Sequence, residues 1–376
     1  AVRPNVVLII LESFSQELVG AANHGIGVTP FLDELTKKSL FFSDNYANAR
    51  RSIEGIGALL GGVPAMMNEP FISSQYLTNY FLGIGTLLKP AGYQSHFFHG
   101  AHNSSMYFDQ FMKSAGIEHY WGLNEYPDPS QYDGTWGIWD EPFLQWMKMK
   151  MDGFPEPFFA SVFTLSSHSP FRVPEVFRGR FPKTFPDGVE CEICESAAYT
   201  DESLKRFFAE AEKSPWFSRT VFIITADHTF KSMRSGGDGE LSQYRIPMWI
   251  YAPGFDLKKV DENMVTQQVD ILPTMIELAG VSHPEINFLG RSVFAKGNRF
   301  AVTFTDNHYL LIDRDVYLKY HRGEDSFNLY GKQDLLEQDE LHDEKVKFEL
   351  TQKLKATMQY FSQGMWDNKL YYPLGK

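Results

Sequence analysis

The sequence has only two cysteines, no long apolar run, and no internal repeats or low-complexity tracts in its 376 residues. No window approaches the roughly 20 apolar residues needed to span a bilayer, and no signal peptide precedes Asn5. We therefore expect the chain as written to be soluble. Because the first predicted strand begins almost at once, we also expect a longer precursor, with membrane association through segments absent from this chain.

The two cysteines lie close together in Cys191-Glu-Ile-Cys194. This spacing permits a small disulfide loop, half of a zinc site, or a redox pair. The second half of a zinc knuckle is missing, and residues 181–189 carry proline and glycine where a redox dithiol would follow a strand. We expect a structural disulfide formed in an oxidising compartment, with two unremarkable thiols as the alternative.

Positive charge is also scarce, because 35 Lys and Arg face 47 Asp and Glu and leave a net charge of −12. This excess of negative charge argues against nucleic acid as a partner and against nonspecific adhesion to an anionic membrane face. An anionic substrate would need local positive charge. With 43% hydrophobic and 15% aromatic residues, the chain is expected to be globular, with a large core.

Short apolar runs alternate with helical patterns over most of the length. This alternation predicts an α/β fold with a doubly wound, mainly parallel sheet and helices on both faces. Strands are expected near 5–11, 38–43, 93–98, 158–165, 219–226 and 246–251. Helices are expected near 29–37, 53–61, 82–90, 104–114, 139–150, 195–212 and 268–280.

The pattern of apolar and polar residues changes near residue 290. Short β-like runs follow at 300–305, 309–312 and 315–321, and then a charged helical stretch at about 341–362. We expect residues 1–290 to form the α/β catalytic domain. Residues 291–376 are expected to form a small C-terminal antiparallel α+β subdomain beside it.

Two apolar runs end in side chains that can bind metal. Glu12 follows the run 5–11, and Asp227-His228 follows the run 220–224. The ends of such strands meet at the crevice where α/β enzymes bind ligands. Taken singly, Glu12 could cap the next segment and His228 could bond a carbonyl group. Together, the three residues predict a metal site.

Ser52 follows Arg50 and Arg51 and stands just before a predicted helix. Free N–H groups and the macrodipole at a helix start favour a serine alkoxide or a bound phosphate. The structural alternative is a plain N-cap, although Gly55 at the third helical position would leave the capping box incomplete. The metal-competent residues favour a metal-activated nucleophile at Ser52, with the two arginines as candidate substrate-binding residues.

His99 and His168 each follow a predicted strand. Imidazoles in this position could bind phosphate oxygens or protonate a leaving alkoxide, which makes both candidate catalytic and substrate-binding residues. Other histidines, among them His96 and His308, lack this setting and are expected to be structural or surface residues.

An ordered set of motifs resembles the lipoteichoic acid synthase-like enzymes of the sulfatase and alkaline phosphatase superfamily. The resemblance covers most of residues 5–295. The set consists of Glu12, Thr29-Pro-Phe-Leu-Asp-Glu-Leu35, Arg51-Ser52, His99-Gly100, Thr164 to Phe171, Asp227-His228, and Gln268-Val-Asp-Ile-Leu-Pro-Thr274.

The resemblance implies one divalent cation, usually manganese, bound by Glu12, Asp227, His228 and the nucleophile's oxygen at Ser52. Zinc or magnesium would also suit these ligands. The nucleophile is threonine in the best-known members and serine here. His99 and His168 match the histidines that line the family's phosphate and glycerol pocket.

Two departures concern that pocket. The tryptophan and arginine expected seven and nine residues after His99 are replaced by Met106 and Phe108. The headgroup pocket therefore lacks a positive charge that the resemblance implies, and we expect a headgroup that can differ from phosphoglycerol. Arg50 or Arg51 could substitute for the lost arginine.

Other enzyme classes fit less well. A sulfatase would need Cys or Ser followed by x-Pro-x-Arg, whereas Ser52 is followed by Ile-Glu-Gly-Ile. A two-metal alkaline phosphatase would carry paired carboxylates after the first strand, where this chain has Glu12-Ser13. The sequence thus favours a single cation and a hydroxyl nucleophile.

The expected function is phosphoryl-headgroup transfer, or phosphodiester hydrolysis, on lipid-linked or polymer substrates through a phospho-serine intermediate. The alternatives are a phosphoethanolamine transferase, a phosphatase, or a non-catalytic domain that binds glycerophosphate polymers or a partner. Because lipid-linked donors and extracytoplasmic polymers are the family's usual substrates, we expect the protein to work in the periplasm or on the outer face of the cytoplasmic membrane.

Overall fold

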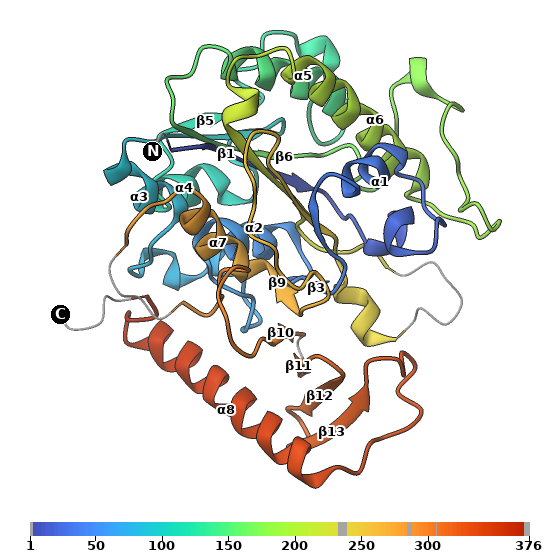
Figure 1. Cartoon of the computed structure of the whole chain (residues 1–376), viewed down its shortest axis with the longest axis vertical. Helices are drawn as coiled ribbons and strands as arrows, with labels where there is room; N and C mark the ends of the chain where they lie inside the picture. The colour runs from blue at the N-terminus through green and yellow to red at the C-terminus, as the bar shows by residue number, and fades with distance from the viewer. Residues whose placement is uncertain (1–2, 232–238, 284–287, 306, 372–376) are drawn as a thin grey trace.

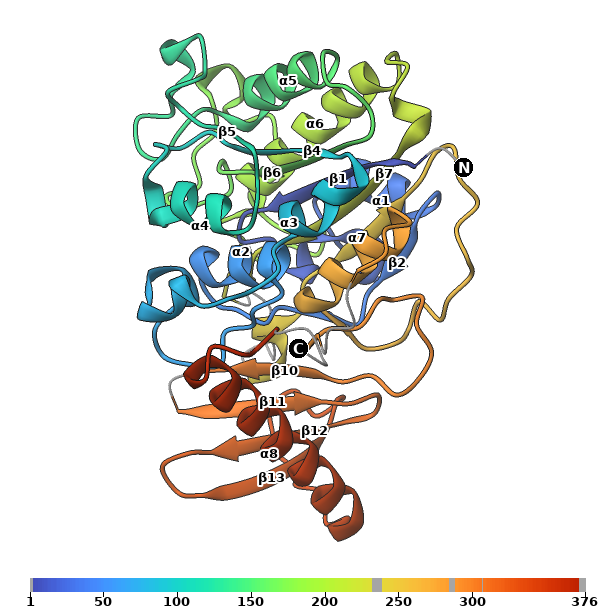
Figure 2. The ribbon, with the colours of Figure 1, turned by 90° about the vertical axis from the view of Figure 1, so that its left-hand side faces the viewer.

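The chain forms a seven-stranded sheet between two layers of helices, with a second, four-stranded sheet below it (Figures 1 and 2). This computed structural model describes residues 3–231, 239–283, 288–305 and 307–371. The large sheet has the spatial order β2 (Leu40–Phe42), β8 (Met248–Tyr251), β7 (Thr220–Ala226), β1 (Asn5–Leu11), β6 (Phe158–Phe163), β4 (Gln94–His99) and β5 (His119–Trp121).

Most neighbouring strands of this sheet run parallel, as the sequence predicts. The exception is β8, which pairs antiparallel with both β7 and β2. The edge strand β5 is absent from the sequence-based expectations because three residues are too few for a periodic signal. At the centre, β1 lies between β7 and β6, and all seven of its residues are buried.

Side chains alternate between the two faces of the sheet, because successive residues of a strand point in opposite directions. In β1, Val6, Leu8 and Ile10 join one core cluster, whereas Val7, Ile9 and Leu11 join the other. The first cluster is covered by α2 (Ser52–Gly61), α3 (Ile84–Leu88), α4 (Phe108–Ser114) and α7 (Ile271–Leu278). The second is covered by α1 (Pro30–Thr36), α5 (Asp140–Met151) and α6 (Cys194–Ala211). The doubly wound α/β architecture is thereby confirmed.

Two of these helices are shorter than expected. The stretch predicted as a helix over 104–114 is helical in α4 only from Phe108, because Met106 and Tyr107 have φ angles of 52° and 58°. These left-handed conformations interrupt an α-helix. The helix expected over 82–90 is reduced to α3, which is followed by a short turn at residues 89–91.

The C-terminal part contains the expected antiparallel sheet and helix. Its strands are β10 (Ala301–Phe304), β11 (His308–Ile312), β12 (Val316–His321) and β13 (Ser326–Gly331), and α8 (Glu344–Trp366) packs on the last two. The sequence-based expectations missed β13. Upstream, the short strands β3 (Asn45–Tyr46) and β9 (Thr266–Gln267) pair in parallel.

The C-terminal sheet shares its apolar core with the main sheet. Leu318 and Leu329 of the small sheet belong to the same buried cluster as the lower face of the large one. The expected boundary near residue 290 falls between α7 and β10, and the division into two domains stays a prediction. Throughout the described segments, no helix combines the length and apolar content that a membrane crossing requires.

Candidate metal centre

Glu12 and Asp227 meet at one edge of the sheet because they extend two adjacent parallel strands. Leu11 of β1 pairs with Ala226 of β7, and the N–H of Asp227 donates to the carbonyl oxygen of Leu11 at 3.2 Å. Glu12 and Asp227, which follow these paired residues, therefore lie side by side at the carboxyl end of the two strands. Both carboxylates are almost fully buried, with 1% of Glu12 and none of Asp227 exposed.

Ser52 reaches this edge at the start of α2. The structure corrects the expectation of a helix beginning at Ile53, because Ser52 is the first helical residue and Arg51 is the N-cap. Glu54, not Gly55, therefore occupies the third position, and its Oε2 accepts the N–H groups of Arg50 and Arg51 at 3.0 and 3.1 Å. Ser52 is thus not the capping residue, so its hydroxyl is available to the cluster.

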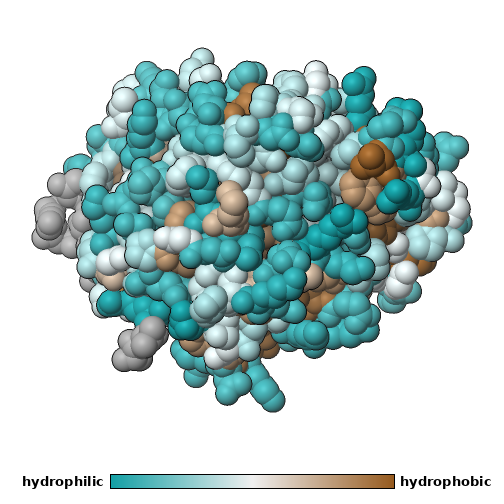
Figure 3. Space-filling model, turned by 90° about the horizontal axis from the view of Figure 1, so that it is seen from above, coloured by the Kyte–Doolittle hydropathy of each residue, from teal (hydrophilic) through white to brown (hydrophobic). Residues whose placement is uncertain are grey.

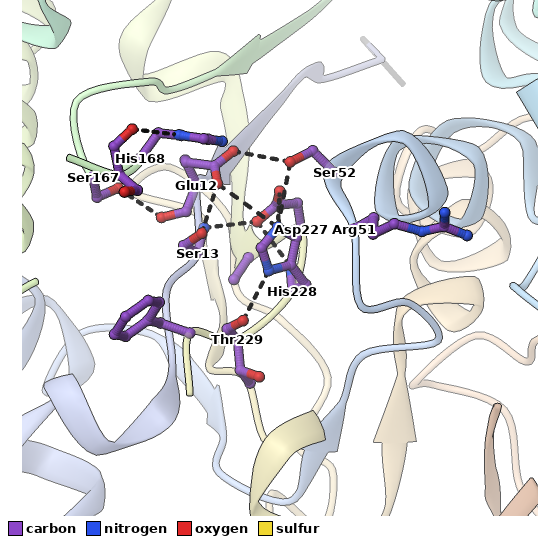
Figure 4. Close-up of polar contacts among 12 residues, drawn as sticks. Glu12, Ser13, Arg51, Ser52, Ser167, His168, Asp227, His228 and Thr229 are labelled. Carbon is purple, nitrogen blue, oxygen red and sulfur yellow. Dashed lines mark hydrogen bonds and ion pairs between the residues drawn. The ribbon is translucent and has the colours of Figure 1, made fainter. Parts of the chain in front are cut away.

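The side chains of Glu12, Ser52, Asp227 and His228 converge (Figure 4). One ligand-competent atom from each of Glu12, Asp227 and His228 lies within 4.8 Å of the other two. Ser52 Oγ lies 3.1 Å from Glu12 Oε2 and 3.3 Å from His228 Nε2. His228 Nε2 is 3.3 Å from Asp227 Oδ2. Four residues separated by up to 216 positions therefore share one small polar volume.

Hydrogen bonds from the surrounding chain orient the cluster. Ser13 has a φ of 55°, and in this conformation its N–H donates to Asp227 Oδ1 at 2.8 Å while its Oγ donates to Glu12 Oε1 at 2.6 Å. The amide of Gln268 donates to the carbonyl oxygens of Ala226 and Asp227 at 2.9 and 2.6 Å. The sequence analysis assigned no role to Ser13 or Gln268. No local sequence pattern predicts a positive φ at a serine or a contact between residues some forty positions apart.

The histidine is fixed in one tautomer. His228 Nδ1 lies 2.8 Å from the carbonyl oxygen of Thr229, which can only accept, so Nδ1 carries the proton. In the neutral ring, the lone pair of Nε2 faces the carboxylates and is available to a cation. Burial lowers the pKa of His228, but the charges of Asp227 and Glu12 outweigh that effect and raise the pKa above its usual value.

The cluster fits a divalent cation. Burial and the nearby charge of Glu12 raise the pKa of Asp227, so this site is unfavourable for two carboxylates on their own. Asp227 Oδ2 is buried and has no hydrogen-bond partner among the described residues. Two carboxylates, one imidazole and one hydroxyl form a donor set that suits manganese, zinc or magnesium.

A family model described as Sulfatase matches residues 4–281 of this chain. The chain belongs to the sulfatase family. Members of this superfamily use a divalent metal, in agreement with the donor set. More closely, the chain is a lipoteichoic acid synthase-like member of the alkaline phosphatase and sulfatase superfamily, as the motif resemblance indicated.

Individual relatives support this placement. Lipoteichoic acid synthase 2 of Bacillus subtilis is 26% identical over 326 residues, which are 81% of this chain and 49% of that protein. A solved structure of an alkaline phosphatase superfamily protein from Vibrio parahaemolyticus is 25% identical, with a TM-score of 0.85 over 99% of this chain and 89% of that one. The lipoteichoic acid synthase LtaP of Listeria monocytogenes has the same fold, at 16% identity and a TM-score of 0.81 over 96% of this chain and 92% of that one. The chain spans about half the length of the curated relatives it matches.

His168 lies beside the cluster in a turn after β6. Its Nδ1 is 2.9 Å from the carbonyl oxygen of Ser169, which leaves Nε2 for exchange with a ligand. Trp136 packs on the imidazole with ring centres 4.1 Å apart, and its indole N–H donates to the same carbonyl oxygen at 2.7 Å. The neighbouring Ser167 hydroxyl donates to the carbonyl oxygen of Glu12 at 2.6 Å, which ties this turn to the end of β1.

His99 has a different environment. It is fully buried at the end of β4, its ring stacks on Phe163 at 4.9 Å, and Phe108 packs edge-on at 5.4 Å. Burial lowers the pKa of His99 to about 4, so the ring is neutral near pH 7. Phe108 stands where the resemblance implies an arginine, and its ring is one of those that bury His99. Its predicted role in catalysis or binding stays a prediction.

The two arginines are not brought into the cluster. The guanidinium of Arg51 is turned away from it (Figure 4) and pairs with the carboxylate of Glu54. The guanidinium of Arg50 lies 5.9 Å from the ring centre of Tyr244. Substrate binding by Arg50 or Arg51 therefore stays a prediction, and each would have to leave its present partner.

Proposed function

We propose that this chain is a metal-dependent phosphoryl-headgroup transferase or phosphodiesterase that works through a phospho-serine at Ser52. The observation that carries this proposal is the position of Ser52 Oγ, at the start of α2 and within 3.3 Å of both Glu12 and His228. In this proposal, Glu12, Asp227, His228 and Ser52 would hold one divalent cation, and manganese is our preferred metal. When bound, the cation supplies positive charge that stabilises the nucleophile and a nonbridging phosphate oxygen.

In the first step, Ser52 Oγ attacks the phosphorus of a phosphodiester, and its proton passes to the carboxylate of Glu12, with which it is already hydrogen-bonded. The O–P bond to the leaving alcohol breaks as the Ser52 O–P bond forms. The leaving alkoxide takes the Nε2 proton of His168, which enters this step as an imidazolium and leaves it neutral. Backbone N–H groups at the start of α2 favour the negative charge that develops beside Ser52.

In the second step, an acceptor hydroxyl attacks the Ser52-linked phosphorus, and the neutral His168 takes the acceptor's proton. The Ser52 O–P bond breaks, and Ser52 recovers its proton from Glu12. When the acceptor is an alcohol, the headgroup is transferred. When the acceptor is water, the same sequence gives hydrolysis.

The headgroup is expected to differ from that of typical relatives. Met106 and Phe108 stand where the resemblance implies a tryptophan and an arginine, and Phe108 contributes an apolar edge instead of a positive charge. A phosphoethanolamine donor, which carries its own cation, is therefore the second candidate beside phosphoglycerol. Assays with phosphatidylglycerol and phosphatidylethanolamine vesicles separate the two.

We further propose that the protein works outside the cytoplasmic membrane, as the catalytic part of an anchored enzyme that acts on phospholipid or glycerophosphate-type substrates. The Cys191–Cys194 disulfide supports this location, because disulfides persist in oxidising compartments. The names of the lipoteichoic acid synthase relatives support the substrate class.

The test is Ser52→Ala in an assay of bis(p-nitrophenyl) phosphate hydrolysis with manganese. Release of p-nitrophenol should fall by several orders of magnitude, because the variant has no nucleophilic oxygen. Ser52→Thr restores a hydroxyl and should keep measurable activity. Ser114→Ala, at the exposed end of α4, is the matched control. Normal turnover by Ser52→Ala would refute the proposal, as would the absence of a Ser52-linked phosphoryl adduct by mass spectrometry in a wild-type sample quenched during turnover.

A further inference from the structure

A groove of about 350 Å³ is lined in part by the residues that follow His168 in the chain. Its lining includes Trp139, Phe171, Arg172, Glu175, Arg178 and Lys183. A pocket of this size is at the small end of the range for ligand sites, which runs from about 300 to 1,000 Å³. We infer that this groove is a binding subsite for a neutral, hydroxyl-rich acceptor such as a sugar chain. This inference rests on the transfer reaction proposed above.

The groove and His168 are built from the same two segments of chain. The N–H of Phe171 donates to the carbonyl oxygen of His168 at 2.8 Å, so the turn that carries the histidine leads directly into the groove lining. On the other side, Trp136 packs on His168, and Trp139 follows three residues later. An acceptor that occupies the groove would therefore contact the two chain segments that carry and pack against the histidine that takes its proton.

Hydrogen bonds hold these two segments together. Asp140 Oδ1 accepts the N–H groups of Leu165 and Ser166 at 2.8 and 3.2 Å, and the Ser166 hydroxyl accepts the N–H of Asp140 at 3.0 Å. Asp133 Oδ1 accepts the N–H groups of Thr135 and Trp136, both at 2.7 Å. The relative position of Trp136, Trp139 and His168 is thus fixed before a ligand arrives.

The far wall of the groove is equally well anchored. Glu195 accepts the N–H of Gly179 at 3.0 Å and lies 3.3 Å from the ammonium group of Lys183. The carbonyl oxygen of Lys183 accepts the N–H of Cys191, one half of the disulfide. The wall is therefore fastened to the start of α6 by an ion pair, two hydrogen bonds and a covalent link.

The charges in the lining are mostly paired with one another, which suits a ligand without net charge. Arg178 lies 3.1 Å from Glu175 and Lys183 lies 3.3 Å from Glu195, so two of the three cations already face carboxylates. These ion pairs offset most of the charge in the lining, and a hydroxylated ligand can donate to the carboxylates and accept from the cations. Among the described residues, Arg172 has no hydrogen bond, ion pair or ring contact, and its exposed guanidinium offers five donors.

The aromatic side chains complete the chemistry of a sugar site. The rings of Trp139 and Phe171 line the groove together with Val173. Aromatic faces carry partial negative charge and attract the polarised C–H groups of a sugar ring, while the planar polar groups around them bind its hydroxyls. Neither a short alkyl chain nor a phosphate alone would use both features.

Direct binding tests the subsite without turnover. Wild-type protein is titrated with neutral α- and β-linked glucose hexamers and with a glycerol phosphate hexamer, and binding is followed by calorimetry. We expect a neutral hexamer to bind and Trp139→Ala and Arg172→Gln each to weaken it about tenfold or more. Trp139→Phe, which keeps an aromatic face, should recover part of the affinity. Trp366→Ala, at the exposed end of α8, should bind like the wild type.

Three results would overturn the inference: no binding of any neutral hexamer, binding of the glycerol phosphate hexamer alone, or equal affinity in the groove variants and the wild type. A second readout is the share of turnovers that end on a supplied hexamer instead of water, which should fall in Trp139→Ala. Because calorimetry needs no activity, failure of Ser52 as the nucleophile and failure of the groove would be seen separately.

Discussion

Single residues in and around the candidate metal centre hold conformations or protonation states that only their surroundings explain. Ser13 adopts a left-handed backbone and bonds both Asp227 and Glu12. A non-glycine residue pays roughly 1 kcal/mol or more for such a backbone. The two hydrogen bonds to buried carboxylates offset that cost, so Ser13 acts as a positioning residue for both.

His96 should make stability depend on pH. It is 2% exposed in β4, its ring stacks on Phe154 at 3.7 Å and on His119 at 4.7 Å, and burial followed by the charge of His119 lowers its pKa to about 3. The unfolded chain, with a pKa near 6.5, takes up the proton first as pH falls. This stabilising contribution is therefore complete above pH 6.5 and is lost below it, by up to about 1.4 kcal/mol per pH unit.

Urea unfolding between roughly pH 7.5 and pH 4.5 measures this effect. His96→Gln should reduce the slope of unfolding free energy against pH by up to about 1.4 kcal/mol per pH unit, because it removes the titrating ring. Groups that do not contact His96 titrate in both proteins and cancel in the comparison. Identical slopes would show that His96 is not the buried neutral histidine described here.

At the scale of elements, the close approach of α2 to the end of β7 depends on Gly55. A Cβ atom at this position would lie 2.4 Å from the carbonyl oxygen of Asp227. Gly55→Ala should therefore push the start of α2, and Ser52 with it, away from Asp227. We expect cation affinity to fall about 10- to 100-fold, as when other residues that support metal ligands are changed, with a parallel loss of phosphodiesterase activity.

Gly57→Ala is the matched control, because a Cβ there would meet no atom closer than 3.8 Å. It lies in the same helix and should leave metal binding unchanged while raising stability by up to about 1 kcal/mol. Calorimetric titration with manganese and urea unfolding of both variants give the comparison. Equal cation affinity in the two variants would argue against the packing role of Gly55.

The Cys191–Cys194 disulfide stabilises the start of α6 and confirms the expectation of a bonded pair. For so short a loop, the chain-entropy model gives about 2 kcal/mol. The double variant Cys191→Ser/Cys194→Ser should lose about that much free energy of unfolding in urea. Detection of two free thiols in the unfolded wild-type protein would contradict the bond itself.

The whole molecule is acidic, yet its two most buried acidic side chains lie next to each other. The net charge is −12, and hydrophilic side chains cover most of the face in Figure 3, where apolar groups are small and separate. Exposed charges are well solvated, so they cost little. Glu12 and Asp227 are removed from water and lie next to each other, so a cation that binds there should stabilise the fold as a whole.

Thermal unfolding after chelation, with and without added manganese, measures this linkage. At a concentration 100 times the dissociation constant, the cation should add about 2.7 kcal/mol to the free energy of unfolding. Asp227→Asn should lose most of this gain, and Asp256→Asn, an exposed carboxylate, should retain it. A melting temperature that does not respond to manganese, zinc or magnesium would contradict the metal centre.

The sequence by itself determined the order of the main strands and helices and the positions of Glu12, Asp227 and His228 at strand ends. It could do so because apolar runs of strand length, closed by a polar residue, are local patterns. Parallel strands then bring their carboxyl ends to one edge, so the meeting of residues 12 and 227 follows from pattern and topology together.

Only the tertiary structure decided that Ser52 begins α2 instead of capping it, that β8 runs against its neighbours, and that Trp136 packs on His168 beside a groove. It also placed Phe108 over His99 and turned Arg51 away from the cluster. Each of these facts depends on contacts between segments distant in sequence, whose energies outweigh local preference and leave no periodic signal in the chain.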